Sequence, residues 1–115
     1  MSETPMREPT FLVLTALAEE PRHGYAVIED VAAMTGGRVR LRAGTLYAAL
    51  DRLRGEGLIE VDREEIVQSR LRRYYRLSAA GERSLATETA RLRDQAAIAE
   101  KRLRARRPEL GGAPA

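Results

Sequence analysis

Arginine and tyrosine side chains cluster in the middle of the chain, and their chemistry is that of hydrogen-bond donors to phosphate. Residues 70–76 read Arg-Leu-Arg-Arg-Tyr-Tyr-Arg, and Arg38, Arg40 and Arg42 alternate along a second short segment. A guanidinium presents a planar fork of donors that matches phosphate and base edges, and a phenol donates one neutral hydrogen bond to a phosphate oxygen. These residue types predict contact with a nucleic acid.

Charge is unevenly distributed along the 115 residues, whose formal net charge is only +3. Residues 1–35 carry two arginines against six acidic side chains, residues 36–76 carry ten basic against six acidic, and residues 77–115 carry eight against five. Nineteen of the twenty basic residues are arginine. The distribution favours a polyanionic partner for the middle and the end of the chain, although a genome rich in arginine codons would give the same excess.

Composition excludes or disfavours several classes of protein. The absence of cysteine removes disulfides, thiolate catalysis and cysteine-based zinc sites. His23 is the single histidine, and we interpret it as part of a helix start rather than as a metal ligand. No nucleophile paired with a base and no glycine-rich phosphate loop is visible, so the sequence predicts neither an enzyme nor a cofactor. Without a secretory signal or a run of ~20 apolar residues, we expect a cytoplasmic protein with no membrane contact.

Hydrophobic spacing predicts three short helices in the first half of the chain. An apolar run over 11–18 follows a Pro-Thr pair that resembles a helix start, and apolar residues recur every three or four positions over 23–34 until two glycines end the pattern. A third helix is expected over 45–55, with Thr45 or a neighbour as its N-cap. Its core-facing stripe comprises Leu46, Ala49, Leu50 and Leu53.

The second half predicts a hairpin and then a long helix. Residues 58–63 and 70–77 read as two strands, and the alternating segment 39–41 could add a short strand to the same sheet. Ser78 is a plausible cap of the last helix, in which Gly81 would be a minor weakness and which nothing breaks before Pro108. Its weak heptad-like seam, which needs a partner surface, comprises Leu85, Thr89, Leu92, Ala96, Ala99 and Leu103.

This order of elements predicts an α+β fold that is mostly helical, a winged helix-turn-helix with a long C-terminal dimerisation helix. We expect a flexible N-terminus over 1–9, a DNA-binding domain over 10–77, the dimerisation helix over 78–107 and a disordered tail over 108–115.

Four segments in this order resemble the PadR-like transcriptional regulators, over roughly residues 10–85. They are Pro21-Arg22-His23-Gly24-Tyr25, Gly44-Thr45-Leu46-Tyr47, the segment from Leu53 to Ile59, and the segment from Arg72 to Gly81. The resemblance is to the family's smaller subgroup, which has a single C-terminal helix. It implies a homodimeric repressor, often released from DNA by a small apolar or aromatic effector.

The resemblance also implies roles for particular residues. Tyr25 and Tyr47 match family tyrosines associated with DNA phosphates, and an effector site is implied near Phe11, Leu14 and Leu92. Two departures matter: the segment 64–69, taken as the wing tip, lacks Gly or Pro and carries two carboxylates, and the chain has no Trp on which a flat ligand could stack.

A helix fits the major groove of DNA, so the third helix is the candidate recognition helix. The expected DNA-binding residues are Tyr25, Arg42, Thr45, Tyr47, Arg52, Arg70, Arg72 and Arg73, and the expected dimer interface comprises Leu85, Leu92, Ala96, Ala99 and Leu103. Alternation would place the even-numbered members of 70–77 on one face of the second wing strand, and only one face would reach DNA well. The alternatives are that the tyrosine rings pack in the core and that the arginines form a solvated surface.

The sequence therefore predicts a ligand-responsive transcriptional repressor that binds double-stranded operator DNA, a palindrome, as a homodimer. The alternative is a winged-helix module that binds protein and attracts nucleic acid only weakly, which the modest net charge and the acidic first third would suit.

Overall fold

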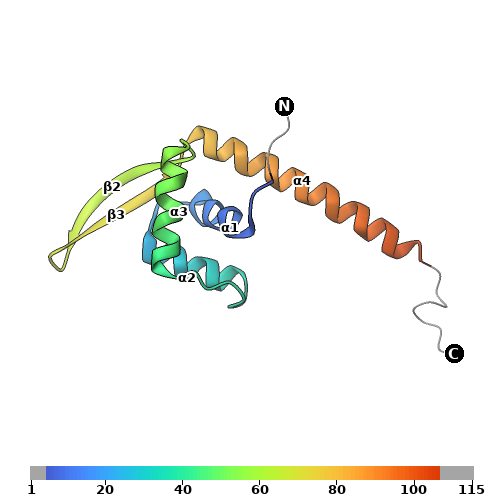
Figure 1. Ribbon diagram of the computed structural model, residues 1–115, viewed down its shortest axis with the longest axis horizontal. Coiled ribbons are helices and arrows are strands. Elements are labelled where there is room, and N and C mark those ends of the chain that lie inside the picture. The colour runs from blue at the N-terminus through green and yellow to red at the C-terminus, as the bar shows by residue number, and fades with distance from the viewer. Residues whose placement is uncertain (1–4, 107–115) are drawn as a thin grey trace.

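The computed structural model describes residues 5–106, which run from a helical N-terminal half through a β-hairpin to a long final helix (Figure 1). In chain order the elements are α1 (Glu8–Ala18), β1 (Arg22–His23), α2 (Gly24–Met34), α3 (Ala43–Gly55), β2 (Ile59–Val67), β3 (Arg70–Leu77) and α4 (Ala79–Arg104). The predicted α+β, mostly helical winged helix-turn-helix order is confirmed.

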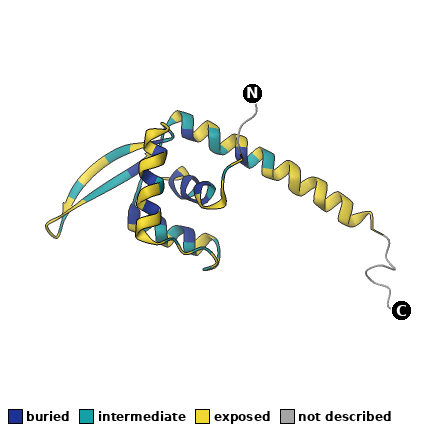
Figure 2. Ribbon diagram, in the orientation of Figure 1, coloured by how far each residue is buried: buried dark blue, intermediate teal, exposed yellow. Residues whose placement is uncertain are grey.

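The first three helices pack around one hydrophobic core, to which the base of the hairpin contributes (Figure 2). The core comprises Leu12, Val13, Leu14, Ala16, Leu17, Val27, Val31, Leu46, Leu50, Leu53, Ile59 and Tyr75. Three members of the stripe predicted on α3, Leu46, Leu50 and Leu53, have no exposed surface. Burying one such side chain contributes about 2 kcal/mol, so this stripe fixes which face of α3 points outward.

The first helix begins two residues before residue 10, the expected start of the DNA-binding domain. Helix α1 begins at Glu8 with Pro9 in its first turn, where a missing backbone N–H breaks no helical hydrogen bond. The Glu8 carboxylate pairs with Arg38, and Met6 packs against the core.

The sheet has the order β1-β3-β2 and is antiparallel throughout. Its third strand is β1, whose Arg22 and His23 pair with Tyr75 and Tyr74. The predicted strand over 39–41 is therefore wrong, because β1 occupies the free edge of β3. Val39 and Leu41 instead pack against the core from an irregular segment, which explains the alternation in the sequence.

Strands β2 and β3 form the hairpin, called the wing below, and β2 continues to Val67, four residues beyond the predicted end. Glu64 and Glu65 are paired strand residues, so the expectation that 64–69 forms the wing tip is wrong. The turn consists of Gln68 and Ser69, whose φ angles are 54° and 65°. A two-residue hairpin turn requires this left-handed backbone, which here occurs without the glycine that usually signals it.

Helix α4 begins as predicted, since the Ser78 Oγ accepts a hydrogen bond of 3.0 Å from the Gly81 N–H. Gly81 is not the weakness expected of it: a Cβ there would lie 1.9 Å from the Leu58 carbonyl oxygen. The cap proposed for α3 is wrong, because its N-cap residue is Arg42 and no side chain caps it.

Two expectations concern the ends of the chain. Helix α4 ends at Arg104, and the predicted tail over 108–115 lies outside the described residues. Across residues 5–106, no helix combines the length and the apolar character that crossing a membrane requires.

Candidate nucleic-acid interface

A groove of about 760 Å³ lies between the start of α2, the outward face of α3 and the wing. Its lining comprises His23, Gly24, Tyr25, Tyr47, Asp51, Val67, Gln68, Arg70, Leu71, Arg72, Arg73 and Tyr75. Five of the eight predicted DNA-binding residues are in this set, although the chain brings them from three separate segments. The groove is the candidate nucleic-acid interface.

Both candidate tyrosines are exposed to solvent. The exposed fractions are 63% for Tyr25 and 49% for Tyr47, so neither ring packs in the core and that alternative is excluded. On α3, the buried neighbour Leu46 forces Tyr47 outward, and Thr45 is exposed one residue before it. The first turn of α3 therefore presents a hydroxyl and a phenol to whatever occupies the groove.

Gly24 lets the tyrosine of α3 approach the start of α2. A Cβ at position 24 would lie 2.5 Å from the Tyr47 Oη and 2.8 Å from its Cζ. The bare backbone of Gly24 therefore forms the surface on which the Tyr47 ring rests. This close approach links the orientation of Tyr47 to the position of α2, a role that sequence reasoning missed and that the Gly-Tyr pair at 24–25 alone could not reveal.

His23 closes the inner end of the groove and caps α2. Its Nδ1 accepts a hydrogen bond of 3.3 Å from the Ala26 N–H, which leaves the ring proton on Nε2. The ring meets Tyr74 edge to face, with centroids 5.3 Å apart. Partial burial, and then the positive charge of Arg72, lowers the pKa of His23. The structural role predicted for this residue at the start of α2 is the one observed.

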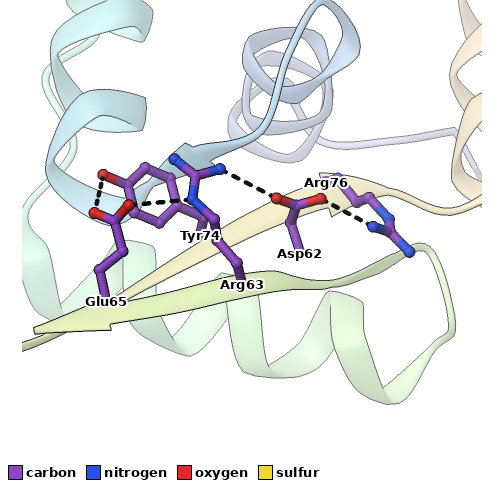
Figure 3. Close-up of polar contacts among 5 residues, drawn as sticks. All are labelled: Asp62, Arg63, Glu65, Tyr74 and Arg76. Carbon is purple, nitrogen blue, oxygen red and sulfur yellow. Dashed lines mark hydrogen bonds and ion pairs between the residues drawn. The ribbon is translucent and has the colours of Figure 1, made fainter.

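Opposite charges cross the two wing strands on the face that carries Tyr74 (Figure 3). The Arg63 guanidinium lies 3.8 Å above the centre of the Tyr74 ring, whose hydroxyl donates to Glu65. Asp62 bridges Arg63 and Arg76 at 3.2 and 2.9 Å. Hydrogen bonds from these arginines lower the pKa values of Asp62 and Glu65. Figure 3 therefore shows a neutralised face, which we call the wing network (Asp62, Arg63, Glu65, Tyr74 and Arg76).

The remaining wing arginines differ in whether a carboxylate already neutralises them. Arg73 pairs with Glu64 at 2.8 Å, and this hydrogen bond raises the pKa of Arg73. Among residues 5–106, no carboxylate lies within ion-pair distance of Arg70 or Arg72. Both line the groove together with Arg73, so side chains from both faces of β3 border it. Which face contacts DNA stays a prediction.

Three predicted DNA-binding residues lie outside the groove lining. Arg42 and Thr45 are exposed at the start of α3. They precede Tyr47, which does line the groove, by a few positions in the chain. Arg52 is at the other end of α3, where it donates to the Thr10 hydroxyl at 2.9 Å and pairs with Glu56. The structure thus gives Arg52 a bracing role between α1 and α3 and does not bring it together with the others.

The residues predicted for the dimer interface occupy two environments. Leu92, Ala96, Ala99 and Leu103 are exposed along α4. Leu85 instead packs partly buried against the core of its own chain. It also borders a second hollow of about 700 Å³ between the end of α1, the end of β3 and α4.

The effector site implied near Phe11, Leu14 and Leu92 needs correction. Leu14 has no exposed surface, so it cannot line a site open to a ligand in this conformation. Phe11 packs against the core, and Leu92 is 38% exposed.

Three helices, a wing and an arginine-lined groove define a winged helix-turn-helix protein. Residues 13–87 match the family model described as "Transcriptional regulator PadR-like family". The chain therefore belongs to the PadR-like family of transcriptional regulators.

Two solved structures and one curated protein are similar to this chain. A PadR family transcriptional regulator from Eggerthella lenta is 31% identical, with 85% of this chain and 83% of that chain covered and a TM-score of 0.69. Bacillus subtilis PadR in complex with operator DNA shares the fold at 22% identity and a TM-score of 0.63, over 70% of this chain and 47% of that one. An uncharacterized protein from Lysinibacillus sphaericus is 27% identical over 70 residues, which are 61% of this chain and 64% of that protein.

Proposed function

We propose that this protein is a DNA-binding transcriptional regulator that binds double-stranded operator DNA as a homodimer and represses the adjacent gene from the cytoplasm. The observation that carries the proposal is the convergence, in one groove beside the outward face of α3, of two exposed tyrosines and two arginines that pair with no carboxylate of residues 5–106. The operator-bound PadR of Bacillus subtilis, which shares the fold, supports it.

The geometry supports a division of labour among these side chains. A helix fits the major groove of B-DNA, where base edges can be distinguished, so α3 and Thr45 are assigned to sequence reading. Arg42, Arg70, Arg72, Tyr25 and Tyr47 are assigned to phosphates, which position the protein without reading sequence. The acidic residues of the wing do not oppose this, since Glu64 and Glu65 are held by Arg73 and Arg63.

The homodimer is proposed from the outer half of α4. Every described residue from 92 to 106 is exposed, and Leu92, Ile98 and Leu103 are apolar. A helix of this kind is not stable without a surface to pack on, and a second copy of the same helix provides one. Two recognition helices would then read half-sites about 10 bp apart.

A small apolar or aromatic effector is proposed for the hollow between α1 and α4. Its apolar lining includes Leu17, Leu77 and Leu85, and Arg76 reaches it from the wing network. A ligand there would contact both the helix assigned to dimerisation and the strand that carries the wing. Ligand-induced loss of DNA binding, together with its suppression by Ala86→Trp, which fills the hollow, would test this assignment.

The experiment that tests the main proposal is a fluorescence-anisotropy titration of the protein against its own upstream intergenic DNA and a scrambled control, at two salt concentrations. Preferential binding that weakens steeply with salt supports the proposal. Arg72→Ala should weaken binding to both probes, whereas Thr45→Ala should reduce the preference between them. Arg83→Ala, an exposed arginine on α4 outside the groove, is the matched control. Equal binding to both probes, with a stable protein partner in a pull-down, would favour the protein-interaction module instead.

A further inference from the structure

The large apolar side chains that remain exposed form two groups apart from Met34. One group lies along α4 and comprises Leu92, Ile98 and Leu103. The other lies on the side of the groove and comprises Tyr25, Tyr47, Ile66 and Leu71. The proposed function uses the α4 group and the two tyrosines, but it leaves Ile66 and Leu71 without a role.

Ile66 and Leu71 are directly opposite each other at the end of the wing. They are the second cross-strand pair from the turn, after Val67–Arg70, and their exposed fractions are 71% and 56%. The pair follows Glu64–Arg73 and Val61–Tyr75 on the same side of the ribbon, which is the side that enters the core at Tyr75. The end of the wing therefore carries an isolated apolar pair, separated from the core by the Glu64–Arg73 ion pair, and Figures 1 and 2 show that this end extends away from the helices.

The wing holds this pair in a fixed place. Strands of nine and eight residues are joined by a two-residue turn, and the wing network ties the strands together nearer the base. An apolar pair on a flexible loop could fold back onto the protein, whereas this one is held in solvent by the ladder. Because leaving both side chains in water forgoes their burial energy, their exposure at a rigid tip calls for a surface that covers them.

The charges beside the pair favour DNA as that surface. Arg70 and Arg72 precede and follow Leu71 in β3, on the other side of the ribbon by strand alternation, yet all three line the groove. Among residues 5–106, no carboxylate lies within ion-pair distance of either arginine. Leu71 also lines the groove assigned to DNA, next to Arg70 and Gln68 at the turn. A partner that fills the groove around Leu71 must also accept the two guanidinium groups that line it. A purely apolar protein surface offers them no partner, whereas the minor groove is lined by phosphates on both sides and by apolar sugar faces.

We propose that Ile66 and Leu71 form an apolar wedge that enters the minor groove of DNA beside the site read by α3, with Arg70 and Arg72 on the bordering phosphates. This inference rests on the proposed DNA-binding function and adds a specificity that the recognition helix does not supply. Side chains such as Ile and Leu partly unstack a base step and bend the duplex, and pyrimidine–purine steps yield most easily. The wing thus selects deformable flanking sequence without hydrogen bonds to bases.

The test compares the wild type with Ile66→Thr/Leu71→Thr and with the apolar control Ile66→Val/Leu71→Ile. Threonine and valine are both β-branched, so each variant keeps a high strand propensity, and thermal unfolding verifies that both fold. Each protein selects duplexes from a random library. Bending of the selected duplex is then measured by energy transfer between dyes at its two ends.

We expect all three proteins to select the same half-site, which α3 reads. The wild type and the apolar control should also enrich a pyrimidine–purine step at a fixed distance outside it and bend the duplex. The threonine variant should lose that enrichment and the bend, and bind the wild-type selection about tenfold more weakly. Identical flanks, bending and affinity for all three would overturn the wedge while leaving the proposed function intact. A wild type that selects no common sequence would overturn both.

Discussion

The wing and the outer half of α4 both extend from the three-helix core, but their support within one chain differs. The wing is held by a ladder, by Arg73–Glu64 and by the wing network, in which Tyr74 contacts both Arg63 and His23. In α4, every described residue beyond Arg91 is exposed. A charged, exposed ribbon can be preorganised by its own cross-strand pairs, whereas a helix with an unpaired apolar stripe requires another surface.

The largest loss of stability is expected where the start of α4 packs against the base of the wing. Gly81→Ala would place a methyl group against the Leu58 backbone, so α4 must shift relative to the base of the wing. We expect a loss of about 3 kcal/mol in the free energy of unfolding, measured by urea denaturation. Gly55→Ala is the control, because a Cβ there meets nothing within 4 Å. Equal stability of the two variants would mean that the joint is not rigid.

Aspartates introduced on the outer half of α4 should disrupt the role proposed for that region and leave the fold of the winged helix intact. If α4 forms the proposed dimer, Ile98→Asp/Leu103→Asp should yield a monomer that keeps a folded winged helix, because neither side chain belongs to the core. Losing the second recognition helix should weaken operator binding about 100-fold. Analytical ultracentrifugation and the anisotropy titration measure the two effects. A dimer that persists would place the interface elsewhere.

A substitution in the wing network should lower the unfolding free energy by less than Gly81→Ala does. Tyr74→Ala removes the ring that Arg63 and His23 contact, and we expect a loss of about 1–2 kcal/mol in unfolding free energy. Tyr74→Phe keeps the ring and removes only the hydroxyl that donates to Glu65, so it should be milder. If the two variants were equally damaging, the hydroxyl rather than the ring would support the wing.

The smallest expected effect is a pH dependence at the base of the wing. Because the pKa of His23 is lowered in the folded protein, its contribution to stability is present above the usual pKa near 6.5 and is lost as the pH falls. Protonation of Nδ1 would also remove the acceptor that caps α2.

His23→Asn keeps a capping side chain but cannot titrate, so its stability should be flat between about pH 7.5 and 5.5, where the wild type declines. Urea denaturation across that range measures the difference. Parallel profiles for the two proteins would assign the decline to a titratable group other than His23.

Much of the architecture was predictable because it depends on local patterns. The stripe on α3, the cap at Ser78 and the hairpin over residues 58–77 follow from periodicity and from side chains that hydrogen-bond to nearby backbone. The exposure of Tyr47 followed as well, because its neighbour Leu46 belongs to the core. The sequence by itself therefore determined the order of the helices and the hairpin, the outward face of α3 and the family.

Only the tertiary structure decided which residues from distant segments meet. The third strand is Arg22–His23 rather than 39–41, because pairing with β3 depends on how α2 packs and not on local alternation. Arg52 donates to Thr10, 42 positions away, and so does not line the groove. Cross-strand register places Glu64 opposite Arg73 and Glu65 opposite Arg72, but Glu65 pairs with Arg63 and Tyr74 instead, so that no carboxylate of residues 5–106 lies within ion-pair distance of Arg72. Long-range pairing is set by packing of the whole chain, which no local spacing encodes.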